Sequence, residues 1–99
     1  MIVLAGTVRI APGRRADAEP EILRVVAASC AEPGCRAYVF AYDVEDDHLV
    51  RIFEVYDDEA ALAAHRASPH FAAWRAAWPV VGIGDRVMKE YRVSEAKDI

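Results

Sequence analysis

Residues 50–78 read VRIFEVYDDEAALAAHRASPHFAAWRAAW, and this stretch decides the fold. Asp57 is expected to cap a short helix that carries His65. Ser68-Pro69 predicts that the helix breaks and restarts, because serine is a favoured cap and proline suits the first helical position. Before the helix, alternation of side chains predicts a strand over 49–56. Its two faces would be Val50, Ile52, Glu54 and Tyr56 on one side, and Leu49, Arg51, Phe53 and Val55 on the other.

Three further strands are expected outside this stretch, over residues 2–10, 36–43 and 85–93. The first of them is apolar on nearly both faces, which is typical of a central strand. Gly6 within it leaves room close to the sheet for a neighbouring side chain or for a ligand. A polar turn at 45–48 joins two of the strands as a hairpin, and residues 79–84 are expected to form a loop.

A helix is expected over 18–31, with Asp17 as its N-cap and Pro20 in its first turn, where amides lack helical partners. The predicted order of elements is therefore β-α-β-β-α-β. Paired middle strands with a crossover helix on either side give a ferredoxin-like α+β fold, with an antiparallel sheet and helices on one face. Right-handed crossovers place the strands at 2–10 and 49–56 in the centre of that sheet.

The chain has 99 residues, and 55% of them are hydrophobic. This length predicts a single domain over 1–93, followed by a C-terminal tail at 94–99. A domain of this size has a thin core, so part of the apolar surface is expected at a subunit interface. Pairing the bare face of the sheet with a second sheet would provide one, which predicts a homodimer.

Charge and composition exclude several classes of partner. The net charge is −4 and the arginines are interleaved with acids, whereas nucleic-acid binding requires a clustered basic surface. No apolar run approaches the roughly 18 residues of a membrane span. No secretory signal is recognisable, so a cytoplasmic protein is expected. Cys30 and Cys35 are then interpreted as reduced core residues, with a disulfide or redox pair as the alternative.

His65 is the first candidate for chemistry. It lies at the edge of the apolar face of its helix, where an imidazole can reach a pocket between helix and sheet. The alternative is a half-buried histidine with a purely structural role. His70 does not complete a metal site on this reading, because the spacing with Pro69 in between separates the two rings and no third ligand follows. No metal is therefore expected, and His48 is interpreted as a turn residue.

Glu54 is an acid in an otherwise apolar strand, so it needs a partner, for which Arg51, His65 or a backbone amide are candidates. Tyr56 brings a hydroxyl to the same face. The numerous aromatic rings are expected in the core, or around a flat apolar ligand. The chain contains no phosphate-binding glycine loop, nucleophile elbow or dinucleotide fingerprint, so no cofactor is expected.

Three segments closely resemble the antibiotic biosynthesis monooxygenase domain family: PGCRAY at 33–38, IFEVYDDEAALAAHRASPHF at 52–71, and Trp74. The family includes quinol monooxygenases and is similar to autoinducer-processing isomerases. The resemblance implies a dimeric α+β barrel with a pocket in each subunit between sheet and helices. It implies catalytic roles for His65, Glu54 and Tyr56. The residues expected to contact substrate are Ile52, Leu62, Phe71, Trp74 and Tyr38.

The resemblance implies a cofactor-independent monooxygenase that uses O2 on a small aromatic quinol, an anthrone-like compound or another enolisable substrate. Family oxygenases that act on anthrones or haem resemble one another in an asparagine near the substrate, and this chain has no asparagine, so haem cleavage is not expected. Two alternatives remain open. One is an isomerase or lyase on a small carbonyl compound with His65 as base, and the other is a ligand-binding dimer without turnover.

Overall fold

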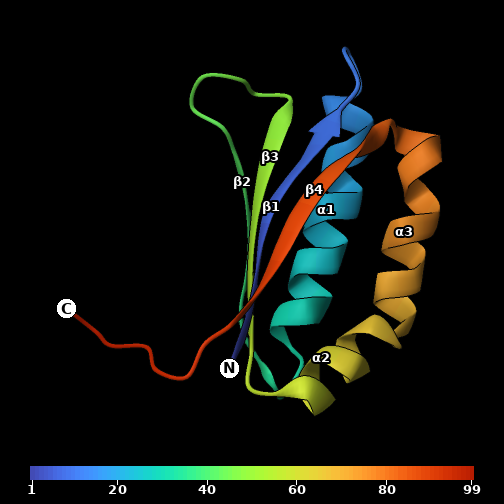
Figure 1. Ribbon diagram of the computed structural model, residues 1–99. Coiled ribbons are helices and arrows are strands. Elements are labelled where there is room, and N and C mark those ends of the chain that lie inside the picture. Colours follow the sequence, from blue (N-terminus) through green and yellow to red (C-terminus); the bar gives the residue numbers. More distant parts are fainter.

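The computed structural model describes residues 1–99 and consists of a single antiparallel sheet with helices packed on one face (Figure 1). The strands run in the order β2-β3-β1-β4, so β1 and β3 are central, as predicted. The fold is the expected ferredoxin-like α+β arrangement. The elements are β1 (Ile2–Ile10), α1 (Arg15–Cys30), β2 (Cys35–Tyr42), β3 (Leu49–Tyr56), α2 (Glu59–Arg66), α3 (Pro69–Val81) and β4 (Ile83–Arg92).

The inner face of the sheet forms the core against the helices. On β1 it is made by Ile2, Leu4, Val8 and Ile10, and on β3 by Val50, Ile52, Glu54 and Tyr56, all of them buried. Helix α1 contributes Ala18, Ile22 and Val25 from one side. Burial of the alternate residues of both central strands follows directly from the period of two that the sequence displays. None of the helices has the length and apolar run needed to cross a membrane.

Helix α1 begins earlier than the sequence predicts. It starts at Arg15, and Arg14 at the cap position makes no side-chain capping bond. Asp17 is not the cap, and it accepts instead from Arg14 Nε at 2.7 Å, while Arg14 Nη2 donates to the Val80 carbonyl at 2.6 Å. The second of these bonds ties the start of the helix to α3. Pro20 consequently lies in the second turn, where it removes one helical hydrogen bond.

Two other boundaries differ from the prediction. Helix α2 is capped by Asp58, whose side chain accepts from the amide of Ala61 at 2.9 Å, because Asp57 instead pairs with Arg36. Helix α3 continues through Pro79 to Val81, so the expected loop over 79–84 is wrong. The proline removes a single donor, and the buried Val81 holds the last turn on the core until Gly82, at φ 80°, ends the helix.

Strand β4 contains a bulge that determines which of its side chains face the helices. The pairing with β1 shifts by one residue between Thr7 and Arg9, and Asp85 in this interval has φ 51°. Because the extra residue interrupts the alternation, Ile83 and Arg86 both point to the inner face although they are three positions apart.

Gly6 on β1 lies directly against β4, with no space for a side chain. A Cβ at this position would lie 1.9 Å from the carbonyl of Val87 and 2.8 Å from the sulfur of Met88. The room expected beside this glycine is thus taken by a neighbouring strand and by the Met88 side chain. Cys30 and Cys35 are free thiols, but Cys30 is exposed, so its assignment to the core is wrong. Burial raises the pKa of Cys35 to about 11.

Candidate active site

A small cavity of about 40 Å³ lies between the inner face of the sheet and helices α2 and α3. All four strands contribute to its wall, and the charged side chains come from β3, β4 and the two helices. The lining residues are Leu4, Val8, Tyr38, Phe40, Ile52, Glu54, His65, Arg66, Phe71, Trp74, Arg75, Trp78, Arg86 and Met88. A volume of this size accommodates about one water molecule.

His65 is the most deeply buried titratable group of this wall, with 1% of its surface exposed. Its ring is surrounded by those of Tyr38, Tyr56 and Phe71, with centroids 5.1–5.3 Å away. Nδ1 lies 2.9 Å from Oε2 of Glu32, whereas Nε2 is buried without a hydrogen-bond partner. Because a carboxylate only accepts, Nδ1 carries the proton and donates it to Glu32. In the neutral ring, Nε2 then has a free lone pair, which is the form of a general base.

Glu32 also joins His65 to His70. The same carboxylate oxygen is hydrogen-bonded to His70 Nε2, and the two imidazole centroids are 5.9 Å apart. The prediction that the rings are separated and lack a third ligand is therefore wrong: α3 restarts against α2, and the loop after α1 supplies the carboxylate. The ligand atoms of all three residues lie within 4.8 Å of one another. Two imidazoles and a carboxylate can hold a divalent transition-metal ion.

Glu54 is bonded to Tyr56 and to neither Arg51 nor a backbone amide. The Tyr56 hydroxyl donates to Oε1 of Glu54 at 2.6 Å, and Arg51 points away to Asp43. Burial raises the pKa of Glu54, although the hydrogen bond from Tyr56 and the charge that His65 carries when protonated oppose the rise. The pKa values of Tyr56 and Tyr38 are raised as well, mainly by burial and next by the charge of Glu54. Both phenols are therefore neutral donors at ordinary pH.

The structure brings most of the predicted site residues together. Tyr38, Ile52, Glu54, His65, Phe71 and Trp74 all line the cavity. Tyr56 lies behind Glu54 and does not reach the wall itself. Leu62 does not line the cavity, because it packs in a separate cluster with Ile2, Leu4 and Tyr56.

Sequence reasoning missed Glu32 and three arginines of the wall, Arg66, Arg75 and Arg86. Arg66 directly follows His65 and Arg75 directly follows Trp74, so adjacency to candidate residues was an available signal for these two. Nothing in the sequence connects Glu32 with His65, 33 positions further along. Arg86 reaches the wall because of the bulge in β4.

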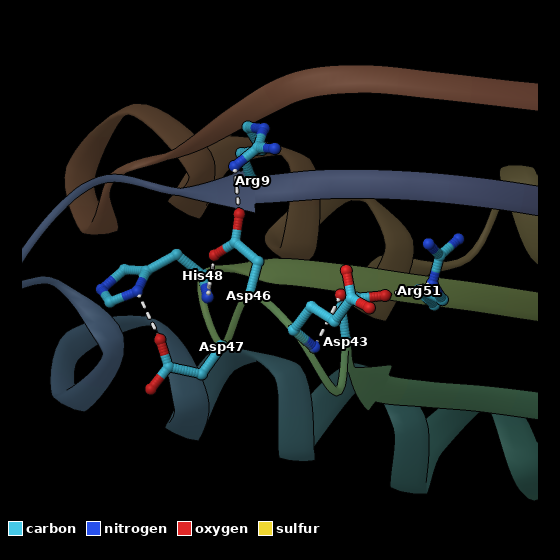
Figure 2. A network of polar contacts seen from close by, with 7 residues as sticks. Arg9, Asp43, Asp46, Asp47, His48 and Arg51 are labelled. Carbon is cyan, nitrogen blue, oxygen red and sulfur yellow. Dashed lines mark hydrogen bonds and ion pairs between the residues drawn. The ribbon is translucent and has the colours of Figure 1, made fainter.

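A second polar cluster lies at the opposite end of β3, in the turn between β2 and β3 (Figure 2). Asp46, Asp47 and His48 also place three potential ligand atoms within 4.8 Å of one another. Here, however, the carboxylates are paired with arginines. Asp46 accepts from Arg9 at 2.9 Å, and Asp47 accepts from Arg15 at 3.0 Å and lies 2.8 Å from Nδ1 of His48.

The turn cluster borders an open hollow of about 640 Å³, lined by parts of the β1–α1, β2–β3 and α3–β4 connections. This hollow is much larger than the inner cavity, but the one histidine of its wall, His48, is half-exposed beside Asp47. The ion pairs give this cluster a structural role, because they link the β2–β3 turn to Arg9 on β1 and to Arg15 on α1. The candidate active site is therefore the inner cavity.

Comparison with known proteins agrees with this architecture. The chain is 28% identical over 98 residues to the Synechocystis protein sll1783, covering 99% of this chain and 67% of that protein. It is 44% identical over 46 residues to "Putative monooxygenase Rv0793" of Mycobacterium tuberculosis, covering 46% of this chain and 45% of that protein. A Deinococcus radiodurans structure, described as a "putative antibiotic biosynthesis monooxygenase", superposes with a TM-score of 0.90 at 23% identity, covering 100% and 98% of the two chains.

A match to a protein family agrees with these pairwise similarities. Residues 1–77, which contain the cavity's strands β1 to β3, helix α2 and most of α3, match the family described as "Antibiotic biosynthesis monooxygenase". This chain belongs to the antibiotic biosynthesis monooxygenase family.

Proposed function

We propose that the protein is a cofactor-independent monooxygenase acting on a small aromatic quinol, an anthrone-like compound or another enolisable substrate. The observation that carries the proposal is the state of His65. Its Nε2 is buried without a partner in the cavity wall, while Glu32 holds the proton on Nδ1. A base that is oriented by a carboxylate and shielded from water is suited to taking a proton from a phenol or an activated carbon.

The reaction balances without an added reductant when the substrate itself supplies the electrons. His65 Nε2 takes a hydroxyl proton from the quinol, and the resulting anion transfers one electron to O2. The substrate radical and superoxide combine to form a C–O bond. A base then removes the hydrogen from that carbon, the O–O bond breaks, and the carbon becomes a carbonyl. Quinol and O2 thus give hydroxyquinone and water, with both oxygen atoms accounted for.

Other groups of the wall would assist the anion. Tyr38 lines the cavity and is neutral, so its hydroxyl can donate to a substrate oxygen. Glu54 is held by Tyr56 and, with its pKa raised, is able to carry a proton on the side of the cavity opposite α2. Phe71 and Trp74 would exclude water from the radical pair.

The cavity has to widen for an aromatic ring. Its volume of about 40 Å³ is smaller than any six-membered ring with substituents. Phe71, Trp78 and Met88 are partly exposed lining residues, and methionine changes conformation at little cost. Displacement of these three side chains would admit substrate without movement of the sheet.

We also infer that the protein is a homodimer, formed through the outer face of the sheet. Val39, Phe53, Val87 and Tyr91 lie on that face and are exposed. The pairing registers place Val39 beside Phe53 and Phe53 beside Ala5, which gives a continuous apolar band across β2, β3 and β1. A monomer of this size rarely leaves such a band uncovered. Sedimentation of wild type and of Phe53→Lys tests it, with the variant expected to sediment as the monomer.

The principal experiment is oxygen uptake by purified protein with a panel of quinols and anthrones, compared with the His65→Gln variant. Glutamine retains a polar group for Glu32 and avoids a large cavity, so the fold is preserved. Uptake that depends on His65 supports the proposal. Unchanged uptake in the variant, with the wild-type melting curve retained, contradicts the role of His65.

An isomerase acting on a small carbonyl compound is the second candidate. His65 as a base and Glu54 as a carboxyl group of raised pKa lie in the same cavity wall, and this favours an isomerase. Isomerisation requires such a pair, because a proton is removed at one carbon and delivered at another. Product formation under argon separates the two functions. The isomerase retains its rate without O2, and the monooxygenase loses it.

A further inference from the structure

We propose that the substrate carries a carboxylate, which Arg75 and Arg86 bind at the mouth of the cavity. The inference rests on the proposed function, since it specifies the class of compound used by the same site. A flat aromatic acid would place its ring between Phe71, Trp74 and His65, and its carboxylate at the two guanidinium groups.

The distribution of ion pairs distinguishes these two arginines from all the others in the chain. Every other arginine lies within 4 Å of a carboxylate oxygen: Arg9, Arg14, Arg15, Arg24, Arg36, Arg51, Arg66 and Arg92. Arg75 and Arg86 have no such partner, and both line the inner cavity. In a protein with a net charge of −4, cations without a partner are not expected to meet at one opening by chance.

Arg75 is held in place although it lacks an anion. Its guanidinium carbon lies 4.2 Å from the ring centroid of Trp78 and 6.0 Å from that of Phe71. Stacking on an aromatic face orients the planar group and leaves its edge N–H donors free. The indole N–H of Trp78 is itself buried without an acceptor, so a further donor in this wall is unsatisfied.

Arg86 lies on β4, across the cavity mouth from α3. The one acid of the wall is Glu54, which is buried and bonded to Tyr56, and the charges of Arg86 and Arg66 favour its ionised form. The remaining arginine of the wall, Arg66, already forms an ion pair with Glu90, with Nη2 3.6 Å from Oε1. A carboxylate at the mouth would therefore meet two free guanidinium groups, which bind planar anions by paired N–H donors.

The experiment measures binding of two probes by calorimetry, 2-naphthoate and its neutral analogue 2-naphthylmethanol. Wild type is expected to bind the acid about tenfold more tightly or better, and added salt is expected to reduce this preference. Arg75→Met and Arg86→Met keep the apolar stems and should each reduce the preference severalfold. Arg24→Met, which breaks a surface ion pair with Glu21, is the matched control and should retain the wild-type preference.

Equal affinity of wild type for the two probes would overturn the inference, as would a preference that survives in the Arg75→Met, Arg86→Met double variant. Neither result bears on oxygen uptake by neutral quinols, which tests the proposed function separately. Conversely, if the protein binds the acid selectively but consumes no oxygen, the monooxygenase proposal fails and the proposal of an anion site stands. Because both arginines are exposed, thermal melting should show that all variants remain folded.

Discussion

The two polar clusters at the ends of β3 have similar composition and opposite environments. Glu32, His65 and His70 come together from the α1–β2 loop, α2 and α3, and the imidazole of His65 has 1% of its surface exposed. Asp46, Asp47 and His48 lie in a solvent-exposed turn, where Arg9 and Arg15 neutralise both carboxylates. The difference shows that composition does not define a site. What distinguishes the inner cluster is a desolvated nitrogen without a partner, next to a cavity.

The largest expected difference between the clusters is in turnover. His65→Gln should reduce turnover by about 10³-fold, within the range of a positioned general base, because it removes the nitrogen lone pair that faces the cavity. His48→Gln should leave turnover unchanged. Steady-state oxygen uptake measures both. Equal losses of turnover in the two variants would contradict the role of His65 as the general base.

The second-largest expected difference is between the effects on turnover of removing the charge of Glu32 and that of Asp47. Glu32→Gln retains an acceptor for the histidines but loses the charge that orients His65, so turnover should fall by about 10²-fold. This is less than the ~10⁴ contributed by the carboxylate of a serine-protease triad, because rings on several sides also hold His65. Asp47→Asn should change neither turnover nor, beyond about 0.5 kcal/mol, the free energy of unfolding. A Glu32→Gln enzyme with wild-type turnover would contradict the orienting role.

The pH dependence of stability should have opposite signs in the two environments. Burial raises the pKa of Glu54 above its ordinary 4.5, so its contribution is complete at lower pH and is lost as pH rises through the folded pKa. Arg9 lowers the pKa of Asp46 below its ordinary 3.8, so that contribution is present above 3.8 and is lost as pH falls through the folded pKa.

Denaturant midpoints of two variants measure these signs. Relative to wild type, Glu54→Gln should gain stability as pH is raised from about 4 to 8, whereas Asp46→Asn should be the less stable protein near neutral pH and approach wild type in acid. Parallel pH profiles for the two variants would show that burial does not dominate at Glu54.

The smallest expected effect is that of metal removal. Both clusters present three potential ligand atoms, yet the proposed reaction uses His65 Nε2 and no metal ion. Dialysis against EDTA should therefore leave oxygen uptake within error of the untreated protein. A loss that Fe²⁺ or Mn²⁺ restores in wild type, and not in Glu32→Gln, would assign the inner cluster to a metal site.

The elements of the fold could be predicted because local patterns determine them. The bounds of β3 follow from its alternation, and Ser68-Pro69 marks the restart at α3. The helix ends could not be predicted as well, since tertiary bonds decide them. Arg14 donates a hydrogen bond to the carbonyl of Val80 at the start of α1. Asp57 forms an ion pair with Arg36, so Asp58 caps α2 in its place.

The site could be predicted in part, for the same reason. His65, Glu54 and the aromatic rings follow from the face that each residue occupies on its own element. Glu32 reaches His65 only through the packing of the α1–β2 loop on α2. Arg86 is hidden by the bulge at Asp85, because strict alternation from the buried Ile83 assigns it to the opposite face of the sheet.

The close approach at Gly6 has a chemical consequence. The Met88 thioether that occupies the space over this glycine is the most easily oxidised group in the wall of a site for which we propose oxygen chemistry. Peroxide released into the cavity would have direct access to this sulfur, because Met88 lines the wall. The protein would then accumulate damage in proportion to its own catalytic history, as sulfoxide on Met88, with Met1 outside the cavity as an internal reference. A sulfoxide is polar and chiral, so it would disturb the apolar packing of the cavity wall. The working lifetime of such an enzyme would then depend on the number of turnovers it has completed and not on elapsed time.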